Sequence, residues 1–377
     1  MRTVVFLETS LRVGGTETVV SQLVLGMDPS RFRPVACCMY EPGELGEKLL
    51  RAGEPVVHGL GAGRWDPRIG VRLFRLLRKE RAAVLFIVNQ PLTQFWGTLC
   101  GILAGVPVRI MAIRSTGKVN RISRRLLINR LTLPWITRVT ALGPTHKAYL
   151  MERERIPASK IEIIPNGVNL QRFSADGTGT DLRQRLGLPA AAPLVGIVAM
   201  LRPEKNHRLF LEAARQVLAK IPAAHFLIIG DGKERPGLEG WVREAGIGPH
   251  VHFLGVREDV PSLVKLLDVA VLSSRPVVET LSNAVLEYMA AARPVVATRV
   301  GCLPEQVAEG ETGFLVDPND AEGMAAKITR LLQDESLRQR MGQAGFARVK
   351  ERYTVERMIR ETESLFDRLL EEAGAAR

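Results

Sequence analysis

The stretch SSRPVVETLSNAVLEYMAAARPVVAT, residues 273–298, carries most of the information about fold and chemistry in this chain. A buried strand that ends at Ser273 is followed by a loop with Glu279, and a helix opens near Ser282–Asn283. The exposed amides and the dipole of a helix N-terminus bind anions. Glu287, about one turn inside, can accept hydrogen bonds from two vicinal hydroxyls such as those of a ribose. The pattern predicts a diphosphate site, although glutamates are also common at ordinary helix starts.

Strands and helices alternate outward from this stretch to both ends of the chain. Short β-branched runs separated by segments of helical period are typical of βαβ units and parallel sheets. In the first half we predict strands at Thr3–Leu7, Pro34–Met39, Val84–Val88, Val108–Ile113 and Arg138–Leu142, and helices at Glu17–Met27, Ile69–Lys79 and Pro91–Ala104. In the second half the predicted strands are Leu194–Met200, His225–Gly230, His252–Leu254, Val269–Leu272, Val295–Thr298 and Gly313–Val316, with helices at His207–Lys220, Val260–Leu266, Ala284–Ala292, Ala321–Gln333 and Glu335–Val349.

A domain boundary is predicted near Asp176–Asp181, where ADGTGTD lacks apolar residues and is rich in turn formers. We therefore expect an α/β fold with two doubly wound domains, residues 1–175 and 181–354, that face a cleft. The segment from Tyr353 to Leu370 has one apolar face. On its own pattern this is a helix packed on the domain before it.

Composition limits the class of protein. Of 377 residues, 46% are apolar and 24% charged, which indicates a globular chain long enough for two cores. No apolar run approaches the roughly 18 residues of a membrane span. Charges and glycines follow the first apolar run too soon for a signal peptide, so we expect a cytoplasmic protein. The four cysteines have neither CxxC spacing nor a histidine cluster and are expected to be buried thiols.

The positive charge lies in the first half of the chain. Residues 1–165 carry 25 Lys and Arg against 12 Asp and Glu, while the remainder carries 27 against 28. No acidic residue occurs between Glu80 and Glu152. A surface of one sign attracts an anionic partner: phospholipid, nucleic acid or a phosphorylated acceptor. Nucleic acid is disfavoured, because no base-stacking motif accompanies the charge.

Within that region, Lys118–Arg138 places Ile122, Leu126, Leu127, Leu131 and Trp135 at helical spacing with arginines between them. An interfacial helix on anionic lipid would show this pattern. An ordinary amphipathic helix with a solvated basic face would show it too. The lack of acidic residues favours a membrane or an anionic acceptor, so we expect a peripheral position at the inner membrane face.

The chain resembles the retaining glycosyltransferases of family four. Residues 279–298 resemble that family's E-x7-E motif and the M-A-x-G-x-P-V-V-A-T that follows it. Six further motifs follow the family order: Gly14–Glu17 (GGTE), Ile164–Asn169 (IPNGVN), Leu201–His207 (LRPEKNH), Gly230–Gly232 (GDG), Phe253–Gly255 (FLG) and Glu311–Val316 (ETGFLV). The resemblance implies a GT-B fold of two Rossmann-like domains, with the C-terminal helix, about 355–377, completing the first.

The resemblance implies roles for residues of the second domain. Glu279 would bind the donor sugar and Glu287 the ribose. Arg202 and Lys205 would neutralise the charge that grows on the departing nucleoside diphosphate, although taken alone they also fit a solvated loop. The remaining donor-binding residues would be Gly255, Val256 and Arg257 beside the base, and Leu281, Ser282, Asn283 and Ala284 at the helix start, where the amides of the last three would bind the diphosphate.

The first domain would supply the other side of the cleft. Gly14 and Gly15 would let backbone approach the diphosphate, since no Cβ stands in the way; they also fit a plain strand-to-helix turn. Asn166 and Gly167 would shape the interdomain turn and touch the cleft. Arg114 stands where many relatives have a histidine near the reacting carbon.

Other departures concern the donor site. Thr280 and Ala292 replace glycines that are usual in the family, and Met200 stands where an arginine is most often found, so that Arg202 is expected to take over its task. None of the six histidines replaces the histidine that many relatives have at the position of Arg114. His58 and His146 are expected to be ordinary surface or core residues without a role in the site.

Together these features predict transfer of a hexose from a nucleoside diphosphate sugar to an acceptor hydroxyl, with retention implied by the resemblance. A lipid-linked or cell-surface glycan precursor is the expected acceptor. No cofactor and no metal are expected, because Arg202, Lys205 and helix amides supply the countercharge. Two alternatives stay open: a sugar-nucleotide epimerase or phosphorolytic enzyme on the same fold, and a degenerate homologue that binds without turnover.

Overall fold

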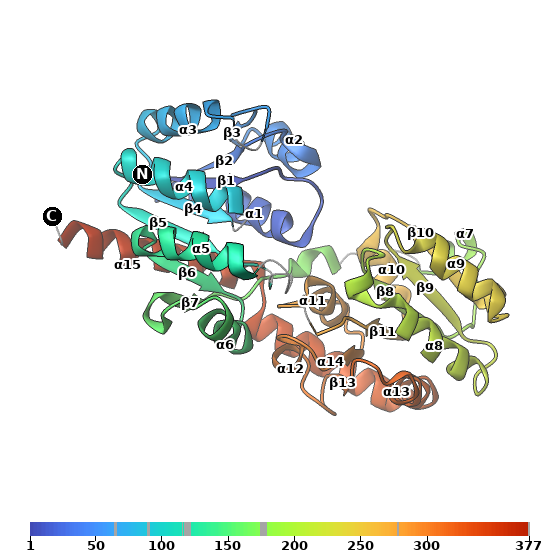
Figure 1. Cartoon of the computed structure of the whole chain (residues 1–377). Helices are drawn as coiled ribbons and strands as arrows, with labels where there is room; N and C mark the ends of the chain where they lie inside the picture. Colours follow the sequence, from blue (N-terminus) through green and yellow to red (C-terminus); the bar gives the residue numbers. More distant parts are fainter. Residues whose placement is uncertain are drawn as a thin grey trace. The chain divides into compact units, whose positions relative to one another are not determined.

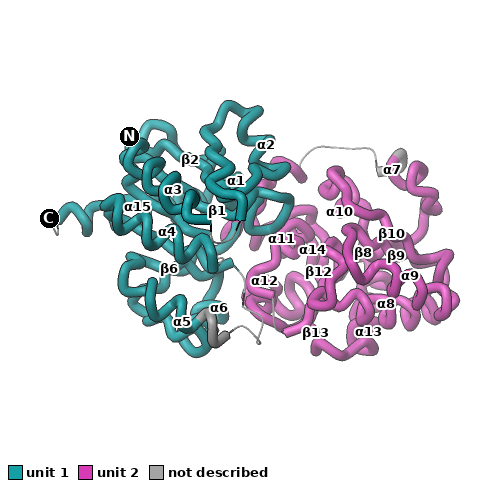
Figure 2. Tube along the Cα trace, turned by 45° about the horizontal axis from the view of Figure 1, so that its top comes forward, with its two compact units in different colours: residues 1–166, 355–377 teal, residues 167–354 magenta. Residues whose placement is uncertain are grey.

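The computed structural model describes residues 1–63, 66–88, 91–114, 116, 122–173, 179–276 and 279–375, with only the backbone of 122–125 and 179–181. The chain divides into two compact units (Figure 2). Unit 1 comprises Met1–Asn166 and Val355–Arg377, and unit 2 comprises Gly167–Thr354.

Unit 1 is built on a parallel sheet of seven strands in the order β3-β2-β1-β4-β5-β6-β7 (Figure 1). Its strands are β1 (Arg2–Glu8), β2 (Phe32–Cys38), β3 (Val56–Val57), β4 (Val84–Val88), β5 (Val108–Ala112), β6 (Arg138–Ala141) and β7 (Ile161–Ile163). Its helices are α1 (Gly15–Gly26), α2 (Gly43–Arg51), α3 (Arg68–Lys79), α4 (Pro91–Leu103), α5 (Ile122–Thr132), α6 (Pro144–Arg153) and α15 (Val355–Ala375), with short 3₁₀ turns at Leu133–Trp135 and Ala158–Lys160.

Apolar side chains project from both faces of this sheet, because helices cover a parallel sheet on both sides. One core packs α1 and α15 against the face that carries Phe6 and Phe86, and the ring of Phe366 from α15 lies 6.0 Å from that of Phe86. The other core packs α3, α4 and α6 against the face that carries Leu7 and Ile87. The strand order reverses direction at β1, so the loop after β1 lies at the switch point where open sheets bind ligands.

Unit 2 has a parallel sheet of six strands in the order β10-β9-β8-β11-β12-β13. The strands are β8 (Leu194–Val198), β9 (His225–Ile229), β10 (Val251–Gly255), β11 (Val269–Leu272), β12 (Val295–Thr298) and β13 (Gly313–Val316). The helices are α7 (Gly179–Arg185), α8 (His207–Leu218), α9 (Arg235–Glu244), α10 (Val260–Leu266), α11 (Asn283–Ala290), α12 (Leu303–Gln306), α13 (Ala321–Gln333) and α14 (Glu335–Arg352), with 3₁₀ turns at Leu170–Phe173, Pro203–Lys205 and Gly248–His250.

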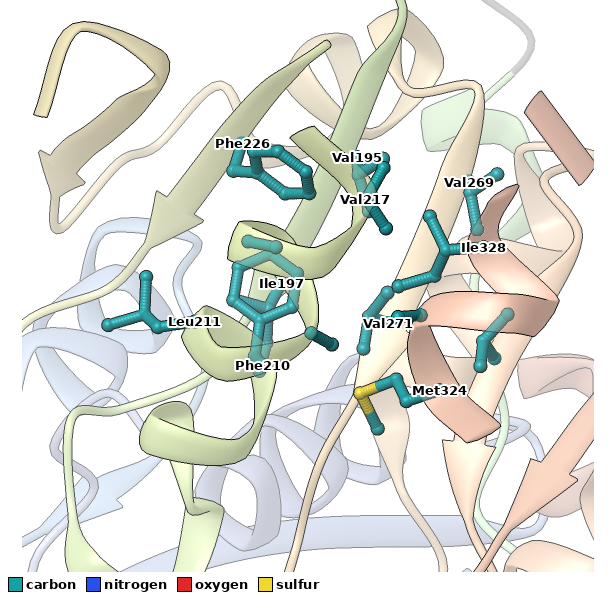
Figure 3. Close-up of a cluster of buried hydrophobic side chains, with 14 of the residues drawn as sticks. Val195, Ile197, Phe210, Leu211, Val217, Phe226, Val269, Val271, Met324 and Ile328 are labelled. Atoms are coloured by element: carbon teal, nitrogen blue, oxygen red, sulfur yellow. The ribbon is translucent and has the colours of Figure 1, made fainter. Parts of the chain in front are cut away.

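The core of unit 2 lies between this sheet and helices α8 and α13 (Figure 3). Phe210 of α8 meets Phe226 of β9 edge to face, with ring centroids 5.9 Å apart. Met324 and Ile328 of α13 fill the space beside Val271 of β11. This packing holds the carboxyl ends of the strands, and the loops that follow them, in fixed positions.

The predicted strands and helices are all present in the described residues, and their ends differ from the predicted ones by at most three residues. The two strands that prediction missed, β3 and β7, are short outer strands of the unit 1 sheet. All four cysteines are free and buried, as expected. The first part of the segment Lys118–Arg138 lies outside the described residues, and its helix is observed as α5.

Unit 2 is an insertion whose two ends meet. Its first strand-like residue, Val168, pairs with Thr354, and the Val168 amide donates a hydrogen bond of 2.8 Å to the Tyr353 carbonyl. The division therefore falls at Asn166–Gly167, before the turn-rich segment in which the boundary was predicted. Hydrogen bonding to the end of unit 2 explains why the chain joins that unit early.

Candidate active site

Three loops at the carboxyl edge of the unit 2 sheet are locked together through their backbones. The Gly230 amide donates to the Gly255 carbonyl at 2.8 Å, and the Leu201 amide donates to the Asp231 carbonyl at 3.0 Å. Gly230 has φ +137°, and a Cβ there would lie 2.2 Å from the Ala199 carbonyl oxygen. The GDG motif therefore requires glycine for close approach of one loop to the next. This contact fixes the loop that carries Arg202 and Lys205.

Lys205 and Glu279, predicted separately from two motifs, are in direct contact. The Lys205 Nζ lies 2.5 Å from the Glu279 Oε2, and the Ser274 hydroxyl donates to the same oxygen at 2.6 Å. Ser273 holds the other loop, since its hydroxyl donates to the Lys205 carbonyl at 2.9 Å. The Glu279 side chain is buried. Two serines at the end of β11 thus position both charged groups, and they were not singled out as site residues.

The loop after Glu279 is fixed by its backbone. Gly301 has φ +53°, and a Cβ there would meet the Glu279 carbonyl oxygen at 1.9 Å. The Cys302 amide donates to the Thr280 carbonyl at 3.0 Å. Thr280, one of the departures from the family pattern, is buried with Leu281. A buried Thr280 adds side-chain volume next to Glu279 that a glycine would lack.

Helix α11 begins as predicted, with Ser282 as its N-cap and the Ser282 hydroxyl accepting from the Val285 amide. One predicted donor is already engaged: the Ser282 amide donates to Gln306 Oε1 at 2.8 Å, and Gln306 Nε2 donates back to the Ser282 carbonyl at 2.9 Å. Sequence reasoning missed Gln306, because nothing in its spacing connects it with Ser282. The other two amides predicted to bind phosphate belong to Asn283 and Ala284, the first residues of the helix.

Glu287 lies half-buried in α11, beside a fully buried neighbour that anchors the helix. The Tyr288 hydroxyl accepts from the Val198 amide at 2.6 Å and donates to the Val271 carbonyl at 3.3 Å, so it joins α11 to β8 and β11. Burial raises the pKa of Glu287, and the positive charge of Arg172 acts in the opposite direction. Glu287 therefore lies on a helix whose position its buried neighbour Tyr288 fixes.

The remaining predicted donor-binding residues of unit 2 are more open to solvent. Arg202 is exposed, and Val256 is 78% exposed. Arg257 forms an ion pair with Asp259 at 2.7 Å, which lowers the pKa of Asp259. Gly255 has φ +69°, a conformation that suits glycine. Arg257 is therefore held by a carboxylate on its own loop.

Unit 1 gathers a separate charged cluster at the carboxyl ends of β1 and β5. Arg114 donates to Asn166 Oδ1 at 2.5 Å, and burial lowers the pKa of Arg114 to about 10. Glu8, at the end of β1, is buried, and its pKa is raised well above the usual range by burial and by the charge of Glu17, while Arg114 and the Thr9 amide oppose this. Glu8 was not predicted as a site residue, because it directly follows the predicted apolar strand Thr3–Leu7 and belongs to no recognised motif.

Gly14 and Gly15 lie at the start of α1, a few residues after Glu8 in the sequence. The Glu17 carboxylate folds back over Gly14, so a Cβ at Gly14 would lie 2.3 Å from the Glu17 Oε2. Asn166 and Gly167 stand at the division between the units, Asn166 ending one and Gly167 beginning the other. Gly14, Gly15, Arg114 and Asn166 thus belong to unit 1, and the other predicted site residues belong to unit 2.

Comparison with known proteins identifies the class. A model described as "Glycosyltransferase Family 4" matches residues 13–172, and one described as "Glycosyl transferases group 1" matches residues 179–348. The chain is 30% identical over 264 residues to alpha-D-kanosaminyltransferase of Streptomyces kanamyceticus. The aligned region covers 66% of this chain and 67% of that protein. It is 27% identical over 284 residues to UDP-Gal:alpha-D-GlcNAc-diphosphoundecaprenol alpha-1,3-galactosyltransferase of Escherichia coli, covering 72% of each.

Solved structures show the same architecture. Anabaena HepE superposes with a TM-score of 0.86 at 20% identity, covering 97% of this chain and 100% of that one. Sucrose-phosphate synthase from Thermosynechococcus elongatus gives a TM-score of 0.83 at 21% identity, covering 99% and 100%. Two Rossmann-like units of this kind define the GT-B fold, as predicted. The chain belongs to glycosyltransferase family 4.

Proposed function

We propose that this protein transfers a hexosyl group from a nucleoside diphosphate sugar to an acceptor hydroxyl with retention of anomeric configuration. The observation that carries the proposal is the Lys205–Glu279 pair beside the N-terminus of α11. A cation, helix amides and a buried carboxylate at one sheet edge match the phosphates and hydroxyls of such a donor. Anabaena HepE, which shares the fold, was solved with UDP and with UDP-glucose.

Each group of unit 2 has a proposed role toward the donor. Glu279 accepts hydrogen bonds from hydroxyls of the sugar, and Glu287 accepts them from the ribose. Lys205 and Arg202 neutralise the diphosphate as its charge grows, together with the amides of Asn283 and Ala284. The loop Gly255–Arg257, with Val256 at its tip, lies beside the base, and Leu281 supports the helix start. In unit 1, Gly14 and Gly15 approach the diphosphate, while Arg114, Asn166 and the adjoining Gly167 serve the acceptor side.

The proposed chemistry is a front-face displacement. The bond between the anomeric carbon and the diphosphate oxygen breaks as the acceptor oxygen bonds to the same face of that carbon. The acceptor proton passes to the leaving phosphate oxygen. Countercharge comes from Lys205, Arg202 and helix amides, so we propose that turnover requires no metal and no cofactor.

For the acceptor we propose a lipid-linked glycan precursor at the inner membrane face, which makes the protein a cytoplasmic, peripheral enzyme of polysaccharide biosynthesis. The E. coli relative is named for a diphosphoundecaprenol-linked acceptor. The basic excess of residues 1–165 suits a diphosphate-linked substrate as well as anionic lipid. Among the described residues, no helix combines the length and apolarity that crossing a bilayer takes.

Incubation with a panel of nucleotide sugars and acceptors tests the proposal. Release of free nucleoside diphosphate that depends on an acceptor, in the presence of a chelator, supports it, and the configuration of the product tests retention. Epimer formation would assign the site to an epimerase, and binding without product to a degenerate homologue. A thermal-shift screen of uridine, guanosine and adenosine diphosphates identifies the base, because a ligand at a hundred times its dissociation constant stabilises by about 2.7 kcal/mol.

A further inference from the structure

Helix α4 exposes only apolar side chains. The solvent-facing positions of Pro91–Leu103 are Pro91, Phe95, Leu99 and Leu103, and Leu103 is 64% exposed. The last three recur every four residues and therefore form one stripe along the helix. The helix contains no charged residue. An outer stripe without a polar residue is unusual for a helix on a protein surface.

Helices α3 and α5 flank α4 and extend this stripe into a surface. Trp96 of α4 packs on α3 at Gly70, where a Cβ would lie 2.5 Å from the Trp96 ring. On the other flank, Gln94 Nε2 donates to Asn129 Oδ1 at 2.9 Å and to Thr132 Oγ1 at 2.8 Å, which joins α4 to α5. The three helices lie on one side of the unit 1 sheet (Figure 1). Their outer side chains therefore form a single face.

We call this surface the α3–α5 face and define it by its exposed large apolar residues: Val71, Phe74, Phe95, Leu99, Leu103, Leu127, Leu131 and Trp135. Leu131 is 64% exposed and Trp135, in the 3₁₀ turn after α5, is 52% exposed. The other exposed large apolar residues of the described chain are scattered over other elements. Concentration on three adjacent helices marks an interaction surface rather than the usual single exposed residues.

The charge of the α3–α5 face has one sign. Helix α3 contributes Arg68, Arg72, Arg75, Arg78 and Lys79, and α5 contributes Arg130. Neither helix, nor α4, contains Asp or Glu. The acidic residues that border α3 are occupied: Asp66 pairs with Arg68, and Glu80 pairs with Arg33 of β2. The face thus combines apolar side chains with cations and no acidic residue of its own.

We infer that the α3–α5 face docks on an anionic lipid bilayer, with its apolar side chains entering the acyl boundary and its arginines on the headgroups. A bilayer offers both an apolar layer and spread negative charge, which are the two complements this face needs. A second copy of the chain would oppose cations with cations. Nucleic acid would supply negative charge but no apolar layer for leucines. Aromatic rings such as Trp135 are also typical of the lipid–water boundary.

Two features separate this inference from simple electrostatic attraction of a basic segment. The apolar stripe lies on α4, which carries no charge, and α3 supplies most of the cations. Binding should therefore need both contributions. It should weaken, but not vanish, when salt is raised from about 0.1 M to about 1 M, which shortens the Debye length from about 10 Å to about 3 Å.

The test is cosedimentation of the full chain with vesicles of phosphatidylglycerol and phosphatidylcholine, compared with vesicles of phosphatidylcholine alone. We expect Leu127→Ser/Leu131→Ser to lower partitioning to the anionic vesicles at least about tenfold, or about 1.4 kcal/mol. The matched control, Leu25→Ser/Leu50→Ser, changes exposed leucines of α1 and α2 and should stay within about twofold. Circular dichroism and melting curves establish that both double variants are folded.

A charge variant and a depth measurement complete the test. Arg75→Gln/Arg78→Gln should weaken binding at low salt, and Arg215→Gln/Lys220→Gln, in and just after α8 of unit 2, should not. Brominated lipid should quench the fluorescence of Trp135, and Trp135→Phe should remove the quenched signal. No donor or acceptor is present, so these results do not depend on the proposed transfer reaction.

Equal binding to both kinds of vesicle, or binding to neither, would overturn the inference. So would wild-type binding by the leucine variant. A dimer in analytical ultracentrifugation that the leucine variant abolishes, without any vesicle binding, would assign the face to a second copy of the chain.

Discussion

Replacement of Lys205 by alanine should cost the ligand-free protein stability as well as activity. The Glu279 side chain is 8% exposed and that of Lys205 28% exposed, with 2.5 Å between the charged atoms. Removing one partner of a buried pair typically costs about 3–5 kcal/mol, because it leaves a buried charge alone. Here water reaches the lysine end, and the Ser274 hydroxyl still donates to Glu279, so we expect about 1–3 kcal/mol.

A double-mutant cycle isolates the pair. Lys205→Ala, Glu279→Gln and the combination would each be unfolded in urea without ligand. The double variant should lose less than the two single losses added together, with a coupling energy of about 1 kcal/mol or more. Lys233→Ala, an exposed lysine of the next loop, is the matched control and should lie within about 0.5 kcal/mol of wild type.

The same variant separates structure from chemistry. Loss of one preorganised countercharge should lower turnover about 10²- to 10³-fold, far more than a change of about 1–3 kcal/mol in unfolding free energy would cause in a protein that stays folded. Turnover of Lys205→Ala within threefold of wild type would refute its proposed role. A coupling energy near zero would show that the Lys205–Glu279 contact does not form in solution.

Three further predictions follow from single sites. Glu287→Ala should weaken binding of the free nucleoside diphosphate and raise the donor KM, whereas Glu279→Ala should leave diphosphate binding nearly unchanged and lower kcat. Ala292→Gly should raise the unfolding free energy by roughly 0.5–1 kcal/mol in a urea titration, because Ala292 has φ +54°, where an L side chain is strained. Stability should fall as pH drops below about 6.5, because the unfolded chain takes up protons more readily than the folded one. Burial lowers the folded-state pKa of both His225 and His252; repulsion from His252 and His250 adds to this at His225, and repulsion from His250 adds to it at His252. Urea titrations of wild type and His252→Asn at several pH values should show a flatter dependence in the variant.

Each of these has a control and an opposing outcome. Equal loss of diphosphate affinity in both glutamate variants would end the proposed division of roles. Ala245→Gly, at a helix end with φ −77°, should destabilise, and the same response at Ala292 would argue against strain there. His58→Asn changes an exposed histidine outside the cluster, and a flattening equal to that of His252→Asn would exclude the His225–His252 contact as the cause.

The sequence predicted the strands well because most are fully buried β-branched runs, such as Val295–Thr298, whose bounds in the structure are the predicted ones. The sequence gives no signal for an element that is too short to show a periodic pattern, or for a feature that depends on contacts between residues remote in sequence. A strand of two residues, Val56–Val57, has no periodicity to detect. The division at Asn166–Gly167 also has no local signal, because the pairing of Val168 with Thr354 joins residues remote in sequence.

The candidate site also depends on contacts between residues remote in sequence, which the sequence did not predict. Motif resemblance identified Lys205 and Glu279 individually, but their contact depends on how two loops after non-consecutive strands fold together. Gln306 and Tyr288 act through hydrogen bonds to the backbone of distant elements, which no spacing rule reports. The apolar stripe of α4 was hidden because a helix rich in apolar residues at nearly every position predicts burial on all sides.

Because Val168 pairs with Thr354, the two ends of unit 2 lie together, and the unit can be transferred between chains as one module. A segment whose two ends lie side by side can be cut out and closed, or grafted between two adjacent positions of another chain, with little loss of loop entropy. Exchange of such a segment between related genes would change the donor while the acceptor-side half stayed intact. The proposed separation of donor and acceptor functions between the two units thus makes new sugar–acceptor combinations accessible by recombination, without redesign of either half.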